Sequence, residues 1–408
     1  MTKNTYVLGI SCYYHDSSAT LIKNGRVVAA AQEERFTRKK HDASFPNEAI
    51  AWCLESERIT IQDVQFIAFY EKPFLKFERL LYQHLQTFPL GWKTFIQAMP
   101  SWVRYKLRTT KTIRKKLKYA GTVFFIPHHL AHAGSAFLPS PFNEAAIVTA
   151  DGVGEWATTT IGKGTGERIE LLNEIPFPHS LGLLYSTITA YLGFSVNNSE
   201  YKVMGLSAYG NMDKMTNPYF KKLMQTIDLK EDGSYRLDMQ YLKYHYSDHM
   251  STQKLCDLLG GPTRGEKSGL TKRHKDIAAA LQLVLEEVMG KILHYAYKKT
   301  GSENLVLAGG VALNSVYNGK ILKTTPFKKI WIQPDAGDGG TSLGAAMYLY
   351  NSILGHKRNY VLKDIYLGPG YSDAHIEYFL KKRKIVYRKC ADDAEVTCGE
   401  CGGDMELG

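Results

Sequence analysis

The feature that most constrains the fold of this chain is an approximate internal repeat. The segment YVLGISCYYHDSSATLIKNGRVVAAAQEE begins at Tyr6, and AAIVTADGVGEWATTTIGKGTGERIELLNE begins about 139 residues later, at Ala145. Each copy has the pattern of an apolar strand, a polar turn, a β-rich strand, a glycine hairpin at residues 23–25 or 162–164, and a further strand. Two such beginnings predict two related subdomains.

Helical spacing separates and follows the two copies. It occurs at residues 47–55, 74–119, 183–192 and 277–297, where apolar side chains recur at intervals of three and four. Strand-rich beginnings followed by helices predict an α/β fold of two lobes with a cleft between them, and such clefts commonly bind nucleotides.

Length and composition limit the class of protein. The 408 residues, 44% of them hydrophobic, suffice for two or three domains. No apolar run approaches the length of a membrane span, and the N-terminus lacks the pattern of a signal peptide. Cys12, Cys53 and Cys256 are typical of buried thiols in a reducing compartment, and we attribute the lone CxxC of Cys398 and Cys401 to coincidence. We therefore expect a soluble, cytoplasmic protein with no membrane partner.

The net charge of +11 raises the question of a nucleic-acid partner. Much of the excess lies between Lys106 and Lys118, where basic residues follow one another without acids. No aromatic motif of an RNA-binding module accompanies them. A solvated helix face is the simplest interpretation, with attraction of an anionic substrate or partner as the alternative. We do not expect a nucleic-acid partner.

Two glycine turns each follow an apolar strand and precede a helix. The first is Gly309-Gly310 in ENLVLAGGVALNS, and the second is Gly339-Gly340 in DAGDGGTSLGAA. A glycine turn before a helix N-terminus can hold a phosphate, and a structural tight turn explains either pair equally well.

Four residues have the types and positions of metal ligands. His128 and His132 in HHLAHAGSAF are four residues apart, which places both imidazoles on one face of a helix. Asp151 ends the apolar strand AAIVTA, and Asp338 begins the second glycine turn. Two imidazoles with carboxylates suit Fe(II), Zn(II) or Mn(II) better than Mg(II) alone.

Eight motifs, in this order, resemble those of one family. They are HDSSATLI, QEERFTRKKHD, HHLAHAGSAF, ADGVGEWATTTI, SLGLLYSTITAYLGF, EYKVMGLSAYG, LAGGVALNS and DAGDGGTSLGAA. They are similar to motifs of the carbamoyltransferase family that includes nodulation and antibiotic-tailoring enzymes, and the resemblance spans about residues 6–370. It implies the duplicated ribonuclease H-like fold of actin, sugar kinases and heat-shock ATPases.

The resemblance also implies cofactors and site residues. A divalent metal, Fe(II) in the first place and Zn(II) or Mn(II) as alternatives, would be held by the four residues above, and the domain would bind ATP or carbamoyl-adenylate. Lys202 in EYKVMG is a candidate phosphate contact or an ordinary surface lysine. His15 and Asp16 are candidates to position or deprotonate the acceptor hydroxyl, with a structural role for His15 as the alternative. The predicted nucleotide contacts are Gly152, Gly154, Gly309, Gly310, Asn314, Gly339 and Gly340.

The expected domain boundaries follow the repeat and the resemblance. A first ribonuclease H-like lobe covers residues 1–144, a second covers residues 145–356, and residues 357–408 look like the truncated start of a YrdC-like domain that activates the carbamoyl group. Two explanations of this short C-terminal segment compete. A truncated or frame-disrupted gene product is favoured by the Cys- and Gly-rich end, and a stand-alone transfer domain with a separate carbamoyl-activating protein as its partner is the alternative.

The leading interpretation is an O-carbamoyltransferase that moves a carbamoyl group from carbamoyl-adenylate to a hydroxyl of a sugar-like or antibiotic-like small molecule. A tRNA threonylcarbamoyl transferase-like enzyme is an alternative that the HxxxH pair also fits. A truncated and catalytically silent nucleotide-binding module is the third interpretation.

Overall fold

The computed structural model describes residues 4–104 and 106–389. The chain divides into two compact units, Met1–Leu367 and Gly368–Gly408. In the described part of the second unit the only regular element is α15 (Asp373–Lys382). No helix within the described ranges is both long and apolar enough to cross a bilayer. The candidate site lies entirely in the first unit.

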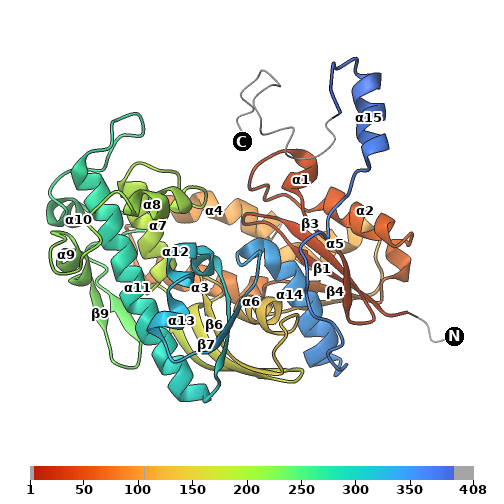
Figure 1. Ribbon diagram of the computed structural model, residues 1–408, viewed down its shortest axis with the longest axis horizontal. Helices are drawn as coiled ribbons and strands as arrows, with labels where there is room; N and C mark the ends of the chain where they lie inside the picture. Colours follow the sequence, from red (N-terminus) through yellow and green to blue (C-terminus); the bar gives the residue numbers. More distant parts are fainter. Residues whose placement is uncertain (1–3, 105, 390–408) are drawn as a thin grey trace. The chain divides into compact units, whose positions relative to one another are not determined.

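The first sheet of Met1–Leu367 contains five strands in the order β3-β2-β1-β4-β5 (Figure 1). The first three pair antiparallel, whereas β4 runs parallel to β1 and β5 parallel to β4. The central strand is buried along its whole length, as its apolar sequence YVLGIS predicts. The strands are β1 (Tyr6–Ser11), β2 (Ser18–Lys23), β3 (Arg26–Gln32), β4 (Phe66–Phe69) and β5 (Thr122–Phe125).

The second sheet repeats this topology with later strands. Its order is β8-β7-β6-β11-β12, again with three antiparallel strands followed by two that run parallel to the first. The predicted two-lobed, duplicated ribonuclease H-like architecture is therefore confirmed. These strands are β6 (Glu144–Ala150), β7 (Ala157–Thr165), β8 (Arg168–Pro176), β11 (Asn304–Ala308) and β12 (Lys329–Ile332), and a separate hairpin pairs β9 (Ile227–Leu229) with β10 (Tyr235–Leu237).

One predicted turn was wrong. Residues 162–164 lie inside β7, where Gly162 and Gly164 pair with residues of β8, and the hairpin turns later, at Gly166 with φ 58°. The glycines are needed for packing and not for a turn, because β7 passes close to α6 at Gly164. A Cβ on Gly164 would lie 2.5 Å from the ring of Phe137, so this glycine lets the strand pass over an aromatic side chain.

The predicted helical segments form helices with shifted ends, and residues 74–119 divide into α3, α4, η2 and α5. Before the second sheet come α1 (Glu34–Thr37), α2 (Asn47–Ser56), η1 (Ile61–Asp63), α3 (Pro73–Gln86), α4 (Trp92–Arg104), η2 (Lys106–Arg108), α5 (Thr109–Leu117) and α6 (His128–Phe137). After β8 come α7 (Leu181–Tyr191), α8 (Glu200–Ser207), α9 (Phe220–Met224), α10 (Gln253–Leu258), α11 (Lys272–Thr300), η3 (Gly310–Leu313), α12 (Ser315–Asn318), α13 (Ile321–Thr324), η4 (Asp338–Gly340), α14 (Thr341–Met347) and the π-helical η5 (Tyr348–Ile353).

The chain returns to the first sheet after it has completed the second. Helix α14 packs on β1 and on α6, and its residues Leu343, Ala346 and Met347 belong to the hydrophobic core of the first sheet. The contact is close, because a Cβ on Gly344 would lie 1.8 Å from the carbonyl oxygen of Ala131 in α6. Both α6 and the turn before α14 are thereby brought to the boundary between the two sheets.

Candidate metal centre and active site

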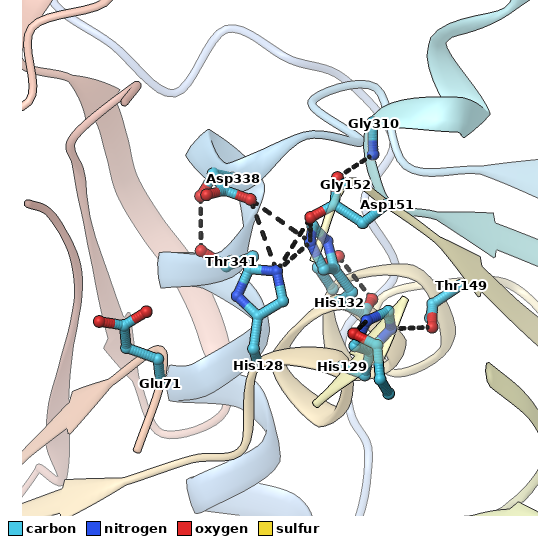
Figure 2. Close-up of polar contacts among 12 residues, drawn as sticks. Glu71, His128, His129, His132, Thr149, Asp151, Gly152, Gly310, Asp338 and Thr341 are labelled. Atoms are coloured by element: carbon cyan, nitrogen blue, oxygen red, sulfur yellow. Dashed lines mark hydrogen bonds and ion pairs between the residues drawn. The ribbon is translucent and has the colours of Figure 1, made fainter. Parts of the chain in front are cut away.

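The two predicted histidine ligands lie one turn apart on α6. His128 and His132 are both buried, and their Nε2 atoms are 3.1 Å apart (Figure 2). The backbone N–H of His128 donates to the Glu155 carboxylate at 3.0 Å, so an acid stabilises the first turn of this helix. The predicted placement of both imidazoles on one helix face is confirmed.

Two carboxylates face this histidine pair. Asp151, which follows β6, places Oδ2 3.1 Å from the Nε2 of His128 and 3.7 Å from the Nε2 of His132. Asp338, the first residue of η4, places Oδ1 3.6 Å from each of the same two nitrogens. One ligand atom from each of the four residues lies within 4.8 Å of the others. The structure thus gathers the four predicted ligands from α6, β6 and η4 (Figure 2).

Charge complementarity dominates the electrostatics of this cluster. Burial works to raise the pKa of both carboxyl groups, but the facing histidines hold the pKa of Asp151 well below its ordinary value and also lower that of Asp338. Burial works in the opposite direction on His132, yet the two carboxylates raise its pKa to about 9. Without a metal, the His132 imidazole is therefore protonated at neutral pH, and it lies between the ionised carboxylates of Asp151 and Asp338.

The spacing of the donor atoms fits a single metal ion. Donors about 2.0–2.2 Å from a metal are roughly 3.0–3.5 Å from one another. The five distances that involve a histidine nitrogen run from 3.1 to 3.7 Å, and all four ligand atoms lie within 4.8 Å of one another. The Nδ1 atoms of His128 and His132 are buried without a hydrogen-bond partner in the described parts of the chain. The Nε2 atoms, which face the acids, are therefore the natural ligand atoms.

His129 lies on a different face of α6 from His128 and His132, so its side chain does not join the cluster. Its ring nitrogens contact the Thr149 hydroxyl at 2.6 Å and the Ala157 carbonyl at 2.9 Å, away from the cluster. Burial lowers the pKa of His129 to about 3, so this imidazole stays neutral. Its role is to join α6 to β6 and β7.

His15 and Asp16 lie beside the cluster. The Nδ1 of His15 is 2.7 Å from an oxygen of Asp16, and its Nε2 is 4.0 Å from Asp338 Oδ2. The other Asp16 oxygen is 2.7 Å from His41, whose second nitrogen is 3.0 Å from Asn198 in the second lobe. A hydrogen-bonded chain therefore connects the first hairpin turn to the opposite lobe.

A cavity of about 270 Å³ lies next to these groups. Its polar lining includes His15, Asp16, His41 and Asp151. The apolar side of the cavity is formed mainly by Leu183, Tyr185, Met204, Leu285, Val311 and Leu313. The cavity lining thus combines ionisable groups, Glu200 among them, with apolar side chains suited to a planar or apolar ligand.

Three predicted nucleotide contacts line this cavity, namely Gly152, Gly310 and Asn314. Two of them already have partners. The N–H of Gly310 donates to Asp151 Oδ1 at 3.0 Å, and the Asn314 amide exchanges two hydrogen bonds with Gln282. Gly310 therefore also orients a candidate metal ligand.

The other predicted glycines are not part of the lining described for the cavity. Gly309 has φ 89° and passes so close to β6 that a Cβ would lie 2.2 Å from the Ala150 carbonyl oxygen. Gly154 packs against the histidines of α6, and Gly339 and Gly340 pack against Asp335. These four positions allow close backbone packing around the ligands.

Lys202 is exposed on α8, with its ammonium 5.9 Å from the ring of Tyr201. Tyr201 and Met204 of the same helix line the cavity, and Lys202 is not among its lining residues. Its contact with a phosphate stays a prediction.

Sequence reasoning missed three groups near the site. His41 and Asn198 complete the chain from His15, and Asp335 accepts a hydrogen bond from Gln32 at 3.0 Å. His41 lies in the segment QEERFTRKKHD, which the resemblance included without assigning it a role. The contact between His41 and Asn198 crosses between the lobes, so no local pattern indicates it.

Comparisons with known proteins give a consistent family. Residues 6–347 match the model of the carbamoyltransferase N-terminus. An uncharacterized protein of Synechocystis sp. is 48% identical over 391 residues, which cover 92% of this chain and 63% of the relative. The nodulation protein NolNO of Sinorhizobium fredii is 34% identical over 88% of this chain and 49% of the relative. The chain therefore spans about half of the length of one of these relatives and less than two-thirds of the other.

Among solved structures, component A of the (R)-2-hydroxyglutaryl-CoA dehydratase of Acidaminococcus fermentans matches with a TM-score of 0.43 and 15% identity, over 86% of this chain and 99% of that one. HypF of T. kodakarensis matches with a TM-score of 0.40 and 13% identity, over 86% of this chain and 48% of that one.

Proposed function

This chain belongs to the carbamoyltransferase family, and on that premise we propose that it transfers a carbamoyl group from carbamoyl-adenylate to a hydroxyl of a sugar-like or antibiotic-like small molecule. The observation that carries this proposal is the position of the four ligand candidates beside a cavity that also contains His15 and Asp16. Such a site brings a Lewis-acid position and a proton acceptor to one reacting centre.

The proposed metal is divalent, with Fe(II) in the first place and Zn(II) or Mn(II) as alternatives. Its ligands would be His128, His132, Asp151 and Asp338, whose mixed nitrogen and oxygen donors suit these ions. When bound, the ion supplies Lewis-acid polarisation of carbamoyl or phosphate oxygens.

In the proposed reaction, the acceptor hydroxyl oxygen forms a bond to the carbamoyl carbon. The bond from that carbon to the adenylate phosphate oxygen breaks, and AMP leaves with its electron pair. The hydroxyl proton moves to the Nε2 of His15, because the Nδ1 is held by Asp16. Burial works to lower the pKa of His15, but Asp16 and Asp338 raise it to about 9. At that pKa His15 holds a proton at neutral pH, so the imidazole must become neutral before its Nε2 can accept one. A cation held by Asp338 would offset the charge of this carboxylate and lower the pKa of His15 toward the range of an efficient general base.

We propose that carbamoyl-adenylate lies along the cavity. The purine would lie against the apolar side chains of Leu183, Leu285 and Val311, and the phosphate would lie near Gly152, all of which line the cavity. This orientation directs the carbamoyl group toward the four ligands.

The transfer assay combines purified chain, synthetic carbamoyl-adenylate, a divalent metal and a panel of hydroxylated acceptors, with carbamate and AMP followed by mass spectrometry. Asp338→Asn should lose metal and reduce transfer at least a hundredfold, because a ligand charge is removed. Asp335→Asn is the matched control. Burial raises the pKa of Asp335 to about 6, and its side chain bonds to Gln32 rather than to the histidines.

Transfer by Asp338→Asn at the rate of the unmodified chain would contradict the metal-dependent mechanism. Absence of product from every acceptor, with intact metal binding and intact nucleotide binding, would contradict the assignment of the reaction.

A further inference from the structure

Helix α3 (orange in Figure 1) buries charged side chains and exposes apolar ones, the reverse of an ordinary surface helix. Its charged residues Lys76 and Arg79 are each only 7% exposed, whereas Phe74 and Leu85 are 71% and 76% exposed. A surface helix normally buries its apolar stripe and exposes its charges. This helix does the opposite, and a contiguous exposed apolar face of this kind is typical of an interaction surface.

The buried contacts of α3 explain why the inversion is stable. The Lys76 ammonium forms a 2.5 Å ion pair with Glu71, and the Arg79 guanidinium lies 4.8 Å from the ring of Phe177. These charges have partners inside the protein. The polar face is therefore fixed inward, and the apolar face is left toward solvent.

Helix α4 continues the apolar surface. Trp92, Ile96 and Val103 are exposed, and their spacing of four and seven residues places them on one face of the helix. Phe88 and Leu90, in the turn between the helices, are exposed as well. We refer to this set as the α3–α4 surface: Phe74, Leu75, Tyr82, Leu85, Phe88, Leu90, Trp92, Ile96 and Val103.

The charge in the segment that carries this surface is mainly positive. Residues 79–143 contain ten Lys and Arg and no Asp or Glu, so this segment accounts for nearly all of the net charge of +11. Glu78 is the single acid among the exposed residues of α3. A second copy of the chain would bring the same cationic segment against itself, and this repulsion disfavours self-association there. The exposed apolar side chains and the neighbouring basic residues fit a partner with an apolar interior and an anionic surface.

We propose that the α3–α4 surface docks on an anionic lipid bilayer. Helices with exposed Trp, Phe and Leu beside Lys and Arg lie in the plane of a membrane interface, where the apolar face enters the acyl region and the basic residues meet anionic headgroups. Surface attachment requires no spanning helix. The sequence-based expectation of no membrane partner rested on the absence of such a span, which does not bear on this mode of binding.

A hollow at one edge of the surface has the same mixed chemistry. It measures about 270 Å³, and Phe74, Leu75 and Phe125 form its apolar wall, with Lys72 and Lys106 also in the lining. This combination matches one anionic lipid, whose phosphate meets ammonium groups while its chain meets aromatic and aliphatic side chains.

The test is flotation of the full chain with phosphatidylcholine vesicles and with vesicles that also contain phosphatidylglycerol. The chain should bind the anionic vesicles at least tenfold more tightly, and binding should weaken as salt rises. Leu85→Ser combined with Phe88→Ser should weaken binding at least tenfold, because both side chains would leave the acyl region. Tyr209→Ser with Met215→Ser is the matched control, since those residues are 75% and 78% exposed outside the α3–α4 surface.

Neutralisation by Lys93→Gln with Arg104→Gln should flatten the salt dependence. Equal binding to neutral and anionic vesicles would overturn the proposal, as would unchanged vesicle binding by the Leu85 and Phe88 variant. A dimer that forms in light scattering through the α3–α4 surface, without vesicle binding, would also overturn it and assign the surface to a second copy.

Discussion

Three histidines within five residues of α6 lie in different surroundings, two in the proposed metal site and one in the packing against the second sheet. His128 and His132 face the acids, whereas His129 faces the strands of the second sheet. The carboxylates raise the pKa of His132 to about 9, and burial lowers that of His129 to about 3. Identical side chains therefore differ in charge at neutral pH because of their position alone.

The raised pKa of His132 predicts that metal affinity depends on pH. A metal must displace the proton that His132 holds below about pH 9, whereas the acids are already ionised. Affinity should therefore rise about tenfold per pH unit between about pH 7 and pH 8.5 for each proton released. Competition with a chelator across this range measures the slope.

Asp335→Asn should retain the same slope, because its carboxylate lies outside the ligand set. A metal affinity that does not change with pH would show that no imidazole proton is displaced.

At the scale of elements, the packing of α14 depends on glycine. Gly344→Ala should lower the free energy of unfolding by about 1–3 kcal/mol, because the added methyl group would meet the Ala131 carbonyl of α6 at 1.8 Å. Gly205→Ala in α8 is the control. Nothing lies within 4 Å of its added Cβ, and alanine favours the helix by up to about 1 kcal/mol.

Urea denaturation of both variants measures the difference. Equal free energies of unfolding for the two variants would mean that α6 and α14 can move apart to admit the methyl group without loss of stability.

Local patterns predicted much of this architecture, and long-range contacts decided the rest. The repeat, the helix His128–Phe137 and the acid after β6 depend on residues close together in the sequence, so periodicity and strand ends indicate them. The inverted face of α3 depends on partners such as Phe177, and the link from His41 to Asn198 crosses the lobes. Periodicity detects the amphipathic character of a helix but not which face lies inside.

For the whole molecule, the proposed metal ligands come from segments that are distant in the sequence. His132 lies in α6, Asp151 follows β6, and Asp338 precedes α14. A ligand that binds only the folded chain stabilises it by about 2.7 kcal/mol at a hundredfold excess over Kd. Chelation should therefore lower the unfolding temperature, and addition of Fe(II), Zn(II) or Mn(II) should restore it.

Differential scanning calorimetry with and without chelator measures this effect. His132→Ala should show an unfolding temperature that does not respond to metal. A full metal response in that variant would place the ion elsewhere.

The late return of α14 to β1 has a consequence for synthesis of the chain. The last strand of the first sheet ends at Phe125, but the helix that covers it begins only at Thr341. At roughly 5–20 residues per second, a ribosome takes on the order of ten to forty seconds to make the segment between them. For that interval the nascent first lobe lacks the helix that covers β1, and transiently exposed apolar surface of this kind is what chaperones bind.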